Sequence, residues 1–393
     1  MVSLRYCRFL ASSLRRNNFL SGKRECSNHS SHHGTQERML AWQIHSYGGI
    51  EELVLSNSVR IPAITSPENI LVKVSASSVN PMDVAMMGGY GSTLLNIGRQ
   101  LKSCSSDTLE FPLILGRDFS GVIVEKGHGV NDSFQFGDEV WGVVSPFQPG
   151  CHAQYTVVPM TNVMKKPSTL NDVEAASVLY AAVTAWSALK ITGDLCLQSA
   201  HGKKVLVLGG SGGVGSAAVV CTCSGDAIPL VESLGADAVI DYTDPNADIL
   251  VLQEGKYDII LNAAGLRHPQ HTKALKEQSL AKYITITSPL LRNADQHGIA
   301  LGMARSAFDL ISSNMNLRSA PFFLGGPSVR WGYFIPSSKA IEEITELAAN
   351  GLLTPAIEKV FPFSELPAAY QKVLNGHSRD GQLYRLDIIL CKQ

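Results

Sequence analysis

The sequence predicts an α/β protein with two domains, one mostly β and one built on a doubly wound parallel sheet. Its 393 residues are 45% hydrophobic and 17% charged, which excludes a disordered chain and is enough for ordinary cores. Short β-type runs fill residues 39–167, and strands alternate with helical stretches over residues 168–353. A glycine-rich turn follows the first strand of the second region, where such folds bind phosphate groups.

The first 24 residues have the composition of a mitochondrial transit peptide. Their six basic residues, with no acid among them, are Arg5, Arg8, Arg15, Arg16, Lys23 and Arg24. In a helix, Leu4, Cys7, Ala11 and Leu14 would lie on the side opposite the arginines. We therefore expect residues 1–38 to direct the protein to the mitochondrial matrix. A disordered basic tail is the alternative.

Charge and cysteine usage exclude several classes of partner. With 33 basic and 34 acidic residues, the chain has no overall field that would attract nucleic acid or an anionic membrane. Eight cysteines without a CxxC pair indicate a reduced compartment, and no metal site is expected. His268 and His271 flank Pro269 and are expected in a loop rather than as metal ligands.

The strands and helices follow in order along the chain. Those expected in the mostly β region are Ile70–Ser75, Gly121–Glu125, Glu139–Val144 and Tyr155–Val158. The apolar run Ala175–Leu189 is too short to span a membrane and predicts a buried helix, with Asn171 and Asp172 as caps. No transmembrane segment is expected. The parallel strands are expected at Lys204–Leu208, Ala238–Asp241, Asp258–Asn262 and Tyr283–Thr287.

The end of the chain is expected to return to the first domain. Ser337–Asn350 has the apolar stripe of a helix, and Gly351 follows as its stop. After it, Ala356–Phe363 and Tyr384–Leu390 are again β-like. The predicted domains are therefore residues 39–167 together with 354–393, and residues 168–353.

The strongest chemical signal is the segment KKVLVLGGSGGVG at residues 203–215. Its glycines follow a strand directly, so they would let backbone N–H groups approach a pyrophosphate at the start of a helix. The next part is abnormally short, because a crossover helix between parallel strands takes about a dozen residues. Either Ser216–Cys223 is a short helix and the second strand is lost, or the strand is kept and the helix is missing. We expect this deletion to impair cofactor binding.

Several segments resemble the zinc-independent quinone-oxidoreductase branch of the medium-chain dehydrogenase/reductases. The matching motifs are SVNPMDVAM (78–86), FPLILGRDFSGVIVE (111–125), FGDEVWG (136–142), YAAVTAWSAL (180–189), GGSGGVG (209–215), LGADAVIDY (234–242) and GHSR (376–379). The resemblance implies a GroES-like catalytic domain, a Rossmann domain that binds NADPH, and a substrate cleft where the two meet.

The resemblance also assigns residues to the cofactor. The pyrophosphate would be held by Ser211, Gly213, Val214 and Gly215, and the adenosine ribose by Ser224 and Tyr242. The path to the nicotinamide would be lined by Asn262 and Ile286, and the ring would lie over Tyr333 and Ile335. The phosphates would be covered by His377, Ser378 and Arg379. Asn80 matches a position near the nicotinamide and is the candidate catalytic residue. An Asn-Pro pair is equally an ordinary turn start.

Departures from the family pattern shape the chemistry. Zinc-dependent members have His-Glu after the glycine at position 116, whereas Arg117 and Asp118 stand here and are expected to form a structural ion pair. Hydride donors without zinc suit quinones or activated enones. Some relatives carry a tyrosine proton donor where this chain has Ala85, which weighs against an enoyl-thioester reductase. Tyr180 and Trp186 are expected in the core rather than at the cofactor.

The resemblance implies NADPH-dependent reduction of a quinone or conjugated carbonyl, in support of ubiquinone synthesis. NADPH is preferred to NADH because Thr222 and Ser224 lie where NAD sites usually carry an acid, although Asp226 is close. The alternatives are an NADPH-binding interaction protein with little turnover and an enoyl-thioester reductase. The resemblance further suggests a homodimer and a membrane-protein partner of the reticulon type.

Overall fold

A computed structural model describes residues 37–103, 110–197, 202–211, 220–233, 236–266, 271–277, 279–317, 326–353, 355, 357–377 and 388–392. Residues 1–36, which make up nearly all of the predicted transit peptide, lie outside this set. So do His268 and the residues that flank it. The fold below is that of the unit Glu37–Gln393.

Six strands form one entirely parallel sheet. They are β8 (Val205–Leu208), β9 (Val220–Cys223), β10 (Ala238–Asp241), β11 (Ile259–Asn262), β12 (Lys282–Thr285) and β13 (Ser328–Trp331). Their spatial order is β10-β9-β8-β11-β12-β13. The chain enters the sheet at the central strand β8, adds β9 and β10 on one side, and then adds β11, β12 and β13 on the other. This order confirms the doubly wound sheet, and the four predicted strands lie within one or two residues of their expected bounds.

The second strand of this sheet is kept. Val220–Cys223 pairs with β8 on one side and with β10 on the other, so the reading of Ser216–Cys223 as a short helix is wrong for its last four residues. The crossover comprises residues 209–219, of which the structure describes Gly209–Ser211 as a turn. Loss of the first crossover helix stays a prediction.

A second sheet joins strands from distant parts of the chain. It consists of β3 (Asn69–Val79), β4 (Asp118–Lys126), β5 (Glu139–Val143), β6 (Tyr155–Pro159), β7 (Val163–Lys165), β14 (Ile357–Pro362) and β15 (Ile388–Lys392). The order is β14-β15-β3-β4-β5-β7, with β6 also paired to β3. Within it, β15 runs antiparallel to β3, with Ile389 opposite Val79. β1 (Arg38–Gln43) and β2 (Val54–Arg60) form a separate pair.

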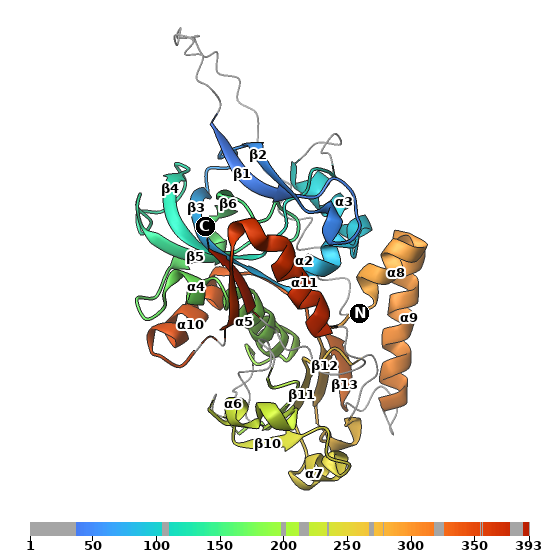
Figure 1. The fold of residues 1–393 in the computed structure, drawn as a ribbon. Helices are drawn as coiled ribbons and strands as arrows, with labels where there is room; N and C mark the ends of the chain where they lie inside the picture. Colours follow the sequence, from blue (N-terminus) through green and yellow to red (C-terminus); the bar gives the residue numbers. More distant parts are fainter. Residues whose placement is uncertain are drawn as a thin grey trace, which may run out of the picture. The chain divides into compact units, whose positions relative to one another are not determined.

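The helices connect and cover these sheets (Figure 1). They are α2 (Pro81–Met87), α3 (Ser92–Ser103), α4 (Asp172–Ala175), α5 (Leu179–Trp186), α6 (Ile228–Ser233), α7 (Ala247–Gln253), α8 (Leu290–His297), α9 (Ile299–Leu317), α10 (Ser338–Ala349) and α11 (Leu366–His377). α10 confirms the helix predicted over Ser337–Asn350, and Ser337 caps it by accepting a hydrogen bond from the backbone N–H of Ala340.

The apolar run predicted as one buried helix is divided. Asn171 caps α4 by accepting a 3.0 Å hydrogen bond from the N–H of Glu174, α5 begins only at Leu179, and a π-helical turn follows at Ser187–Thr192. Among the described residues, one helical stretch, Asp172–Thr192, is long and apolar enough to cross a membrane by composition alone, and more than half of it is buried inside the protein.

Candidate cofactor and active site

The predicted cofactor residues gather at the carboxyl edge of the parallel sheet. Those that follow or end a strand there are Ser211, Ser224, Tyr242, Asn262, Ile286, Tyr333 and Ile335. Because parallel strands end at the same edge, the structure brings these seven together. Gly213, Val214, Gly215, Ser378 and Arg379 lie outside the described residues, and His377 ends α11.

The start of the glycine turn has the geometry that a nucleotide loop needs. Gly209 has φ +89°, and a Cβ there would lie 3.0 Å from the backbone nitrogen of Ala264. The N–H groups of Gly209 and Gly210 both donate to the carbonyl oxygen of Thr222, at 3.1 and 2.9 Å. The turn is therefore tied to β9, and glycine is required at its first position.

The part of the candidate cofactor site that would hold the adenosine ribose carries both hydroxyl groups and carboxylates. Thr222 is buried within β9, whereas Ser224 is half-buried and reachable. Asp226 is exposed two residues on, and a Cβ on Gly225 would lie 2.5 Å from a carboxylate oxygen of Asp241. Of the two hydroxyls on which the NADP preference rested, Ser224 alone is accessible, and two carboxylates lie near it.

Further along the edge, side chains hold the strand ends in place. Asn262 is buried, donates a 2.7 Å hydrogen bond to the carbonyl oxygen of Leu266 and accepts one of 3.2 Å from the Leu266 N–H. It therefore fixes the turn after β11. The Tyr333 hydroxyl lies 3.1 Å from that of Ser288, and burial raises the pKa of Tyr333, so this tyrosine stays protonated.

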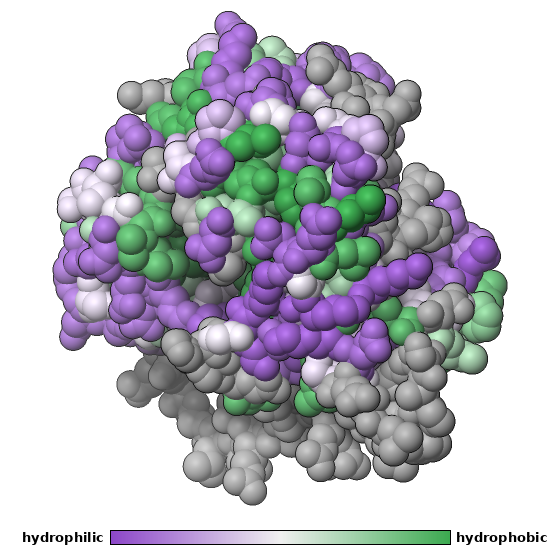
Figure 2. Space-filling model, turned by 90° about the horizontal axis from the view of Figure 1, so that it is seen from below, coloured by the Kyte–Doolittle hydropathy of each residue, from purple (hydrophilic) through white to green (hydrophobic). Residues whose placement is uncertain are grey.

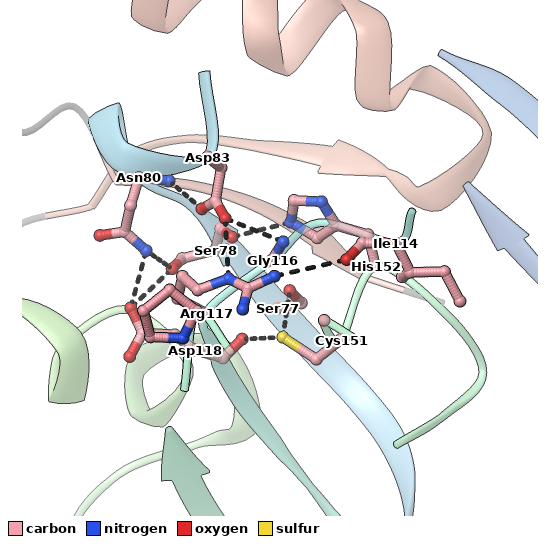
Figure 3. A network of polar contacts seen from close by, with 12 residues as sticks. Ser77, Ser78, Asn80, Asp83, Ile114, Gly116, Arg117, Asp118, Cys151 and His152 are labelled. Atoms are coloured by element: carbon pink, nitrogen blue, oxygen red, sulfur yellow. Dashed lines mark hydrogen bonds and ion pairs between the residues drawn. The ribbon is translucent and has the colours of Figure 1, made fainter. Parts of the chain in front are cut away.

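Asn80 lies in a buried polar network at the end of β3 (Figure 3). Its amide nitrogen donates to Asp118 Oδ2 and to Ser78 Oγ, both at 3.0 Å. Its backbone N–H donates to Asp83 Oδ2 at 2.9 Å, which closes the first turn of α2. Asn80 thus begins a helix, as an Asn-Pro pair often does, and its side chain is also held in one orientation.

The expected ion pair between Arg117 and Asp118 is wrong. Arg117 Nε pairs with Asp83 Oδ1 at 3.4 Å, and both side chains are fully buried. The guanidinium also donates to the carbonyl oxygen of Ser145 at 2.8 Å. Successive side chains in an extended segment point to opposite faces, so Arg117 and Asp118 reach different partners (Figure 3).

Asp118 is a buried carboxyl group surrounded by donors. Besides Asn80, Ser78 donates to it at 2.9 Å and the backbone N–H of Tyr180 at 2.5 Å. Burial raises the pKa of Asp118 to about 7, and the charge of Asp83 acts in the same direction, while the three hydrogen bonds lower it. The carboxyl group therefore changes protonation near neutral pH.

Tyr180 connects this network to the parallel sheet. Its backbone bonds Asp118, and its ring lies against the ring of Phe334, with centroids 4.4 Å apart. Phe334 stands between Tyr333 and Ile335, which are predicted cofactor residues. Tyr180 and Trp186 also pack against a core cluster, in line with the packing role expected for them.

Two further buried side chains in this region, His152 and Tyr370, were not predicted from the sequence. His152 Nε2 lies 2.9 Å from the carbonyl oxygen of Ser78, and its Nδ1 lies 3.2 Å from the hydroxyl of Tyr370. Burial lowers the pKa of His152, which keeps the ring neutral. No local motif marks this pair. Asp83 could have been found, since an acid three residues after Asn80 completes a capping-box pattern.

Metal ligands do not cluster in this region. Among the residues that the structure describes, no group of three or more His, Cys, Asp or Glu side chains could hold a metal ion. Asn80 and Asp118 bond to each other, and Arg117 brings a positive charge into the same network. The arrangement can orient an amide and bind or release a proton at Asp118.

Two family descriptions match the chain. Residues 66–168 match the alcohol dehydrogenase GroES-like domain, and residues 234–381 match zinc-binding dehydrogenase. The chain is 42% identical over 363 residues to "NAD(P)H oxidoreductase RTN4IP1, mitochondrial" of Drosophila melanogaster, across 87% of this chain and 85% of that protein. It is 34% identical over 355 residues to "Reticulon-4-interacting protein 1, mitochondrial" of Caenorhabditis elegans, across 87% of this chain and 94% of that protein.

A solved structure supports the fold. The quinone oxidoreductase of Coxiella burnetii superimposes with a TM-score of 0.66 at 23% identity, covering 91% of this chain and 100% of that chain. At this identity the likeness concerns the fold alone. It confirms the combination of a GroES-like sheet and a Rossmann-like sheet.

Proposed function

The chain belongs to the medium-chain dehydrogenase/reductase family, and we propose that it transfers hydride from NADPH to a quinone or a conjugated carbonyl. The fly and worm relatives are both named as mitochondrial, and the fly protein as an NAD(P)H oxidoreductase, which shows an oxidoreductase of the NAD(P)H type and a mitochondrial localisation. Placement in the matrix and removal of residues 1–38 as a transit peptide belong to the proposal.

One observation carries this proposal. The Asn80–Asp118 pair connects through the backbone of Tyr180 and the ring of Phe334 to the segment that follows β13. The candidate catalytic amide is thereby tied to the sheet edge that gathers the predicted cofactor residues. A reduced nicotinamide at that edge would supply the hydride, since no side chain can do so.

The residues of this chain would orient and protect the reaction. The strand-turn arrangement at Gly209, with its positive φ, is how nucleotide-binding loops begin, which supports a dinucleotide at this edge. Asp118 and Ser78 hold the Asn80 amide in a fixed direction, which favours a single arrangement of the reacting groups. We propose a zinc-free reaction, because Arg117 and Asp118 replace the metal-binding His-Glu pair and a quinone oxygen needs no Lewis acid.

The choice of NADPH over NADH is proposed on Ser224, the accessible one of the two hydroxyl groups Thr222 and Ser224, with Arg379 as the cation for a phosphate. Asp226 and Asp241 oppose it, so the two cofactors must be compared directly. Replacing Ser224 with Asp should reduce the affinity for NADPH more than the affinity for NADH, because a third carboxylate would repel a 2′-phosphate. Calorimetry with both cofactors measures this difference.

A role in ubiquinone synthesis and a reticulon-type partner are also proposed; the second rests on a relative named for such a partner. A low-turnover NADPH-binding protein remains the second candidate, because Ala85 in α2 offers no proton donor. An enoyl-thioester reductase is disfavoured for the same reason. We further propose a homodimer, as the family resemblance suggests.

Steady-state oxidation of NADPH with a short-chain quinone, an enone and an enoyl thioester separates these candidates. We expect turnover with the quinone or enone above that of buffer, and its loss in Asn80→Ala with cofactor binding retained. Binding of NADPH without faster oxidation in any of the three mixtures would instead support the interaction protein.

A further inference from the structure

The side chain of His152 has buried partners at both of its ring nitrogens. Nε2 lies 2.9 Å from the carbonyl oxygen of Ser78, and Nδ1 lies 3.2 Å from the hydroxyl oxygen of Tyr370. A carbonyl oxygen can only accept a hydrogen bond, so Nε2 carries the proton. Because the ring is neutral, Nδ1 keeps a lone pair and accepts from the Tyr370 hydroxyl. The two partners therefore select one tautomer and one orientation of the ring.

Packing holds the imidazole in this place. His152 is 1% exposed, its backbone N–H donates to the carbonyl oxygen of Leu115 at 2.9 Å, and its carbonyl oxygen accepts from the N–H of Trp42 at 2.9 Å. The ring also lies against Gly116, where a Cβ would come within 2.6 Å of His152 Cδ2. The ring is therefore fixed against β3, α11 and the segment that precedes β4.

The hydrogen bond from His152 supports the end of β3. The pairing of β3 with β4 ends at Ser77, which lies opposite Phe119. The next residue, Ser78, is the one whose carbonyl oxygen accepts from the imidazole. The hydroxyl group of the same residue accepts a 3.0 Å hydrogen bond from the side-chain amide of Asn80. Ser78 thus connects the imidazole to the candidate catalytic amide.

A second path leads from the same ring to Asn80 (Figure 3). The N–H of Gly116, which lies against His152, donates to Asp83 Oδ1 at 2.9 Å. The other carboxylate oxygen of Asp83 accepts from the backbone N–H of Asn80, also at 2.9 Å. The imidazole therefore contacts one residue on each path, Ser78 by a hydrogen bond and Gly116 by packing.

The polar character of the His152–Tyr370 pair favours a role beyond packing. Hydrophilic side chains form much of the surface that Figure 2 shows, whereas His152 and Tyr370 are 1% and 0% exposed. Tyr370 belongs to an apolar core cluster, where a phenylalanine ring would fill similar space without a hydroxyl group. Burying polar groups costs free energy that their hydrogen bonds offset, so the pair contributes direction more than stability.

We propose that His152 is a positioning residue for the reaction: its Nε2–H holds the Ser78 peptide group and, through it, the direction of the Asn80 amide. This role rests on the proposed function, in which Asn80 acts beside the nicotinamide. Misplacement of reacting groups by about 1 Å lowers a rate by as much as about a hundredfold. Loss of the Nε2 donor should therefore lower kcat and leave cofactor binding intact.

Two substitutions separate the donor from the packing of the ring. In His152→Gln the side-chain amide nitrogen can take the place of Nε2 and donate to Ser78, whereas in His152→Asn the shorter side chain reaches only the place of Nδ1. Both remove the aromatic ring, so both should lower the thermal midpoint to a similar extent. With NADPH and the short-chain quinone, we expect kcat to fall at least about tenfold in His152→Asn and to stay within about threefold of wild type in His152→Gln. The KM for NADPH should be unchanged in both.

Tyr370→Phe is the control for the other ring nitrogen. It removes the hydrogen bond to Nδ1 of His152 but leaves the bond from Nε2 to Ser78, so we expect kcat within about threefold of wild type. A kcat of His152→Asn equal to that of wild type would overturn the proposal. So would an equal loss of kcat in His152→Asn and His152→Gln, which would reduce His152 to a packing residue.

Two measurements do not depend on turnover. In crystal structures we expect the Asn80 amide to keep its bonds to Asp118 and Ser78 in His152→Gln and to lose at least one of them in His152→Asn; an unchanged Asn80 in both would overturn the positioning role. In wild type labelled with 15N-histidine, an NMR signal of His152 protonated at Nδ1 alone would overturn it as well. Absence of turnover by wild type with every acceptor would refute the proposed function, and the crystal structures would then decide the role of His152.

Discussion

The carboxylate of Asp118 accepts a 3.0 Å hydrogen bond from the side-chain amide of Asn80. Both groups are buried, and the same carboxyl group has its pKa raised to about 7. The orientation of the candidate catalytic amide and a proton equilibrium near neutral pH are therefore linked in one contact.

Asp118→Asn should change how stability depends on pH. Because the pKa of Asp118 is higher in the folded than in the unfolded chain, the folded state binds the extra proton between about pH 4 and pH 7, and stability falls as the pH rises through this range. We expect the free energy of unfolding of the wild type to fall by roughly 2–3 kcal/mol more than that of the variant between pH 5 and pH 8. Urea denaturation at several pH values measures it, and parallel curves would refute the shift.

Asp83→Ala should destabilise the protein severely. It removes the partner of the buried Arg117 and leaves an uncompensated charge, at a cost of about 3–5 kcal/mol. Asp138→Ala is the control, because Asp138 pairs with the exposed Lys165 and such pairs contribute less than about 1 kcal/mol. Equal losses in chemical denaturation would contradict the ion pair described here.

Gly209→Ala should cost more stability than Gly137→Ala. Both residues have positive φ values, +89° and +85°, but a Cβ on Gly209 meets the backbone of Ala264 while one on Gly137 meets nothing within 4 Å. We expect a difference of about 1–3 kcal/mol between the two variants, caused by the contact rather than by the backbone conformation. Thermal or urea unfolding of both measures it.

Restoring a crossover helix should strengthen the fold and the cofactor site. Insertion of about twelve helix-forming residues after Ala218 would supply a helix N-terminus for the pyrophosphate and cover one face of the strands. We expect a higher thermal midpoint and a larger rise of that midpoint with NADPH than in the chain as printed. Adding Gly213→Asp to the longer form should remove the NADPH effect. A cooperative transition of the printed chain that shifts equally with NADPH would show that the short connection suffices.

Reversal of the arginines should abolish mitochondrial import. Replacing Arg5, Arg8, Arg15 and Arg16 with Glu removes the positive face of the predicted leader helix. We expect a fluorescent fusion of the variant to stay in the cytosol while the unaltered leader directs the fusion to mitochondria. Import of both would show that the leader acts by other means.

Local patterns predicted the parallel sheet well and the buried contacts poorly. Strands such as Val205–Leu208 are continuous apolar runs, and the glycine turn after β8 is marked by its own residues. No local pattern marks the partner of Arg117. Whether Arg117 pairs with Asp83 or with Asp118 depends on the direction in which each side chain points in the folded protein. The bond from Tyr180 to Asp118 joins positions 62 residues apart, and no periodicity reports such a contact.

The second strand of the parallel sheet, β9, could not be predicted from local composition either. Ser216–Cys223 suits a helix or a strand by composition, and the sheet decides, because β8 and β10 both offer hydrogen-bonding edges to Val220–Cys223. The sequence could place the candidate cofactor residues at strand ends, because topology fixes the common edge of parallel strands. It could not predict that Thr222 is buried, because this burial depends on packing within β9.

The pairing of β15 with β3 has a consequence for folding. Ile389 lies opposite Val79, so the sheet that contains β3 and β15 lacks an interior strand until almost the whole chain is available to fold. Contacts of such long separation form late, and an unpaired strand edge attracts other unfolded chains meanwhile. We therefore expect chaperones to protect the chain until β15 can pair with β3, and we expect deletion of β15 to harm assembly more than an equally short deletion in a surface loop.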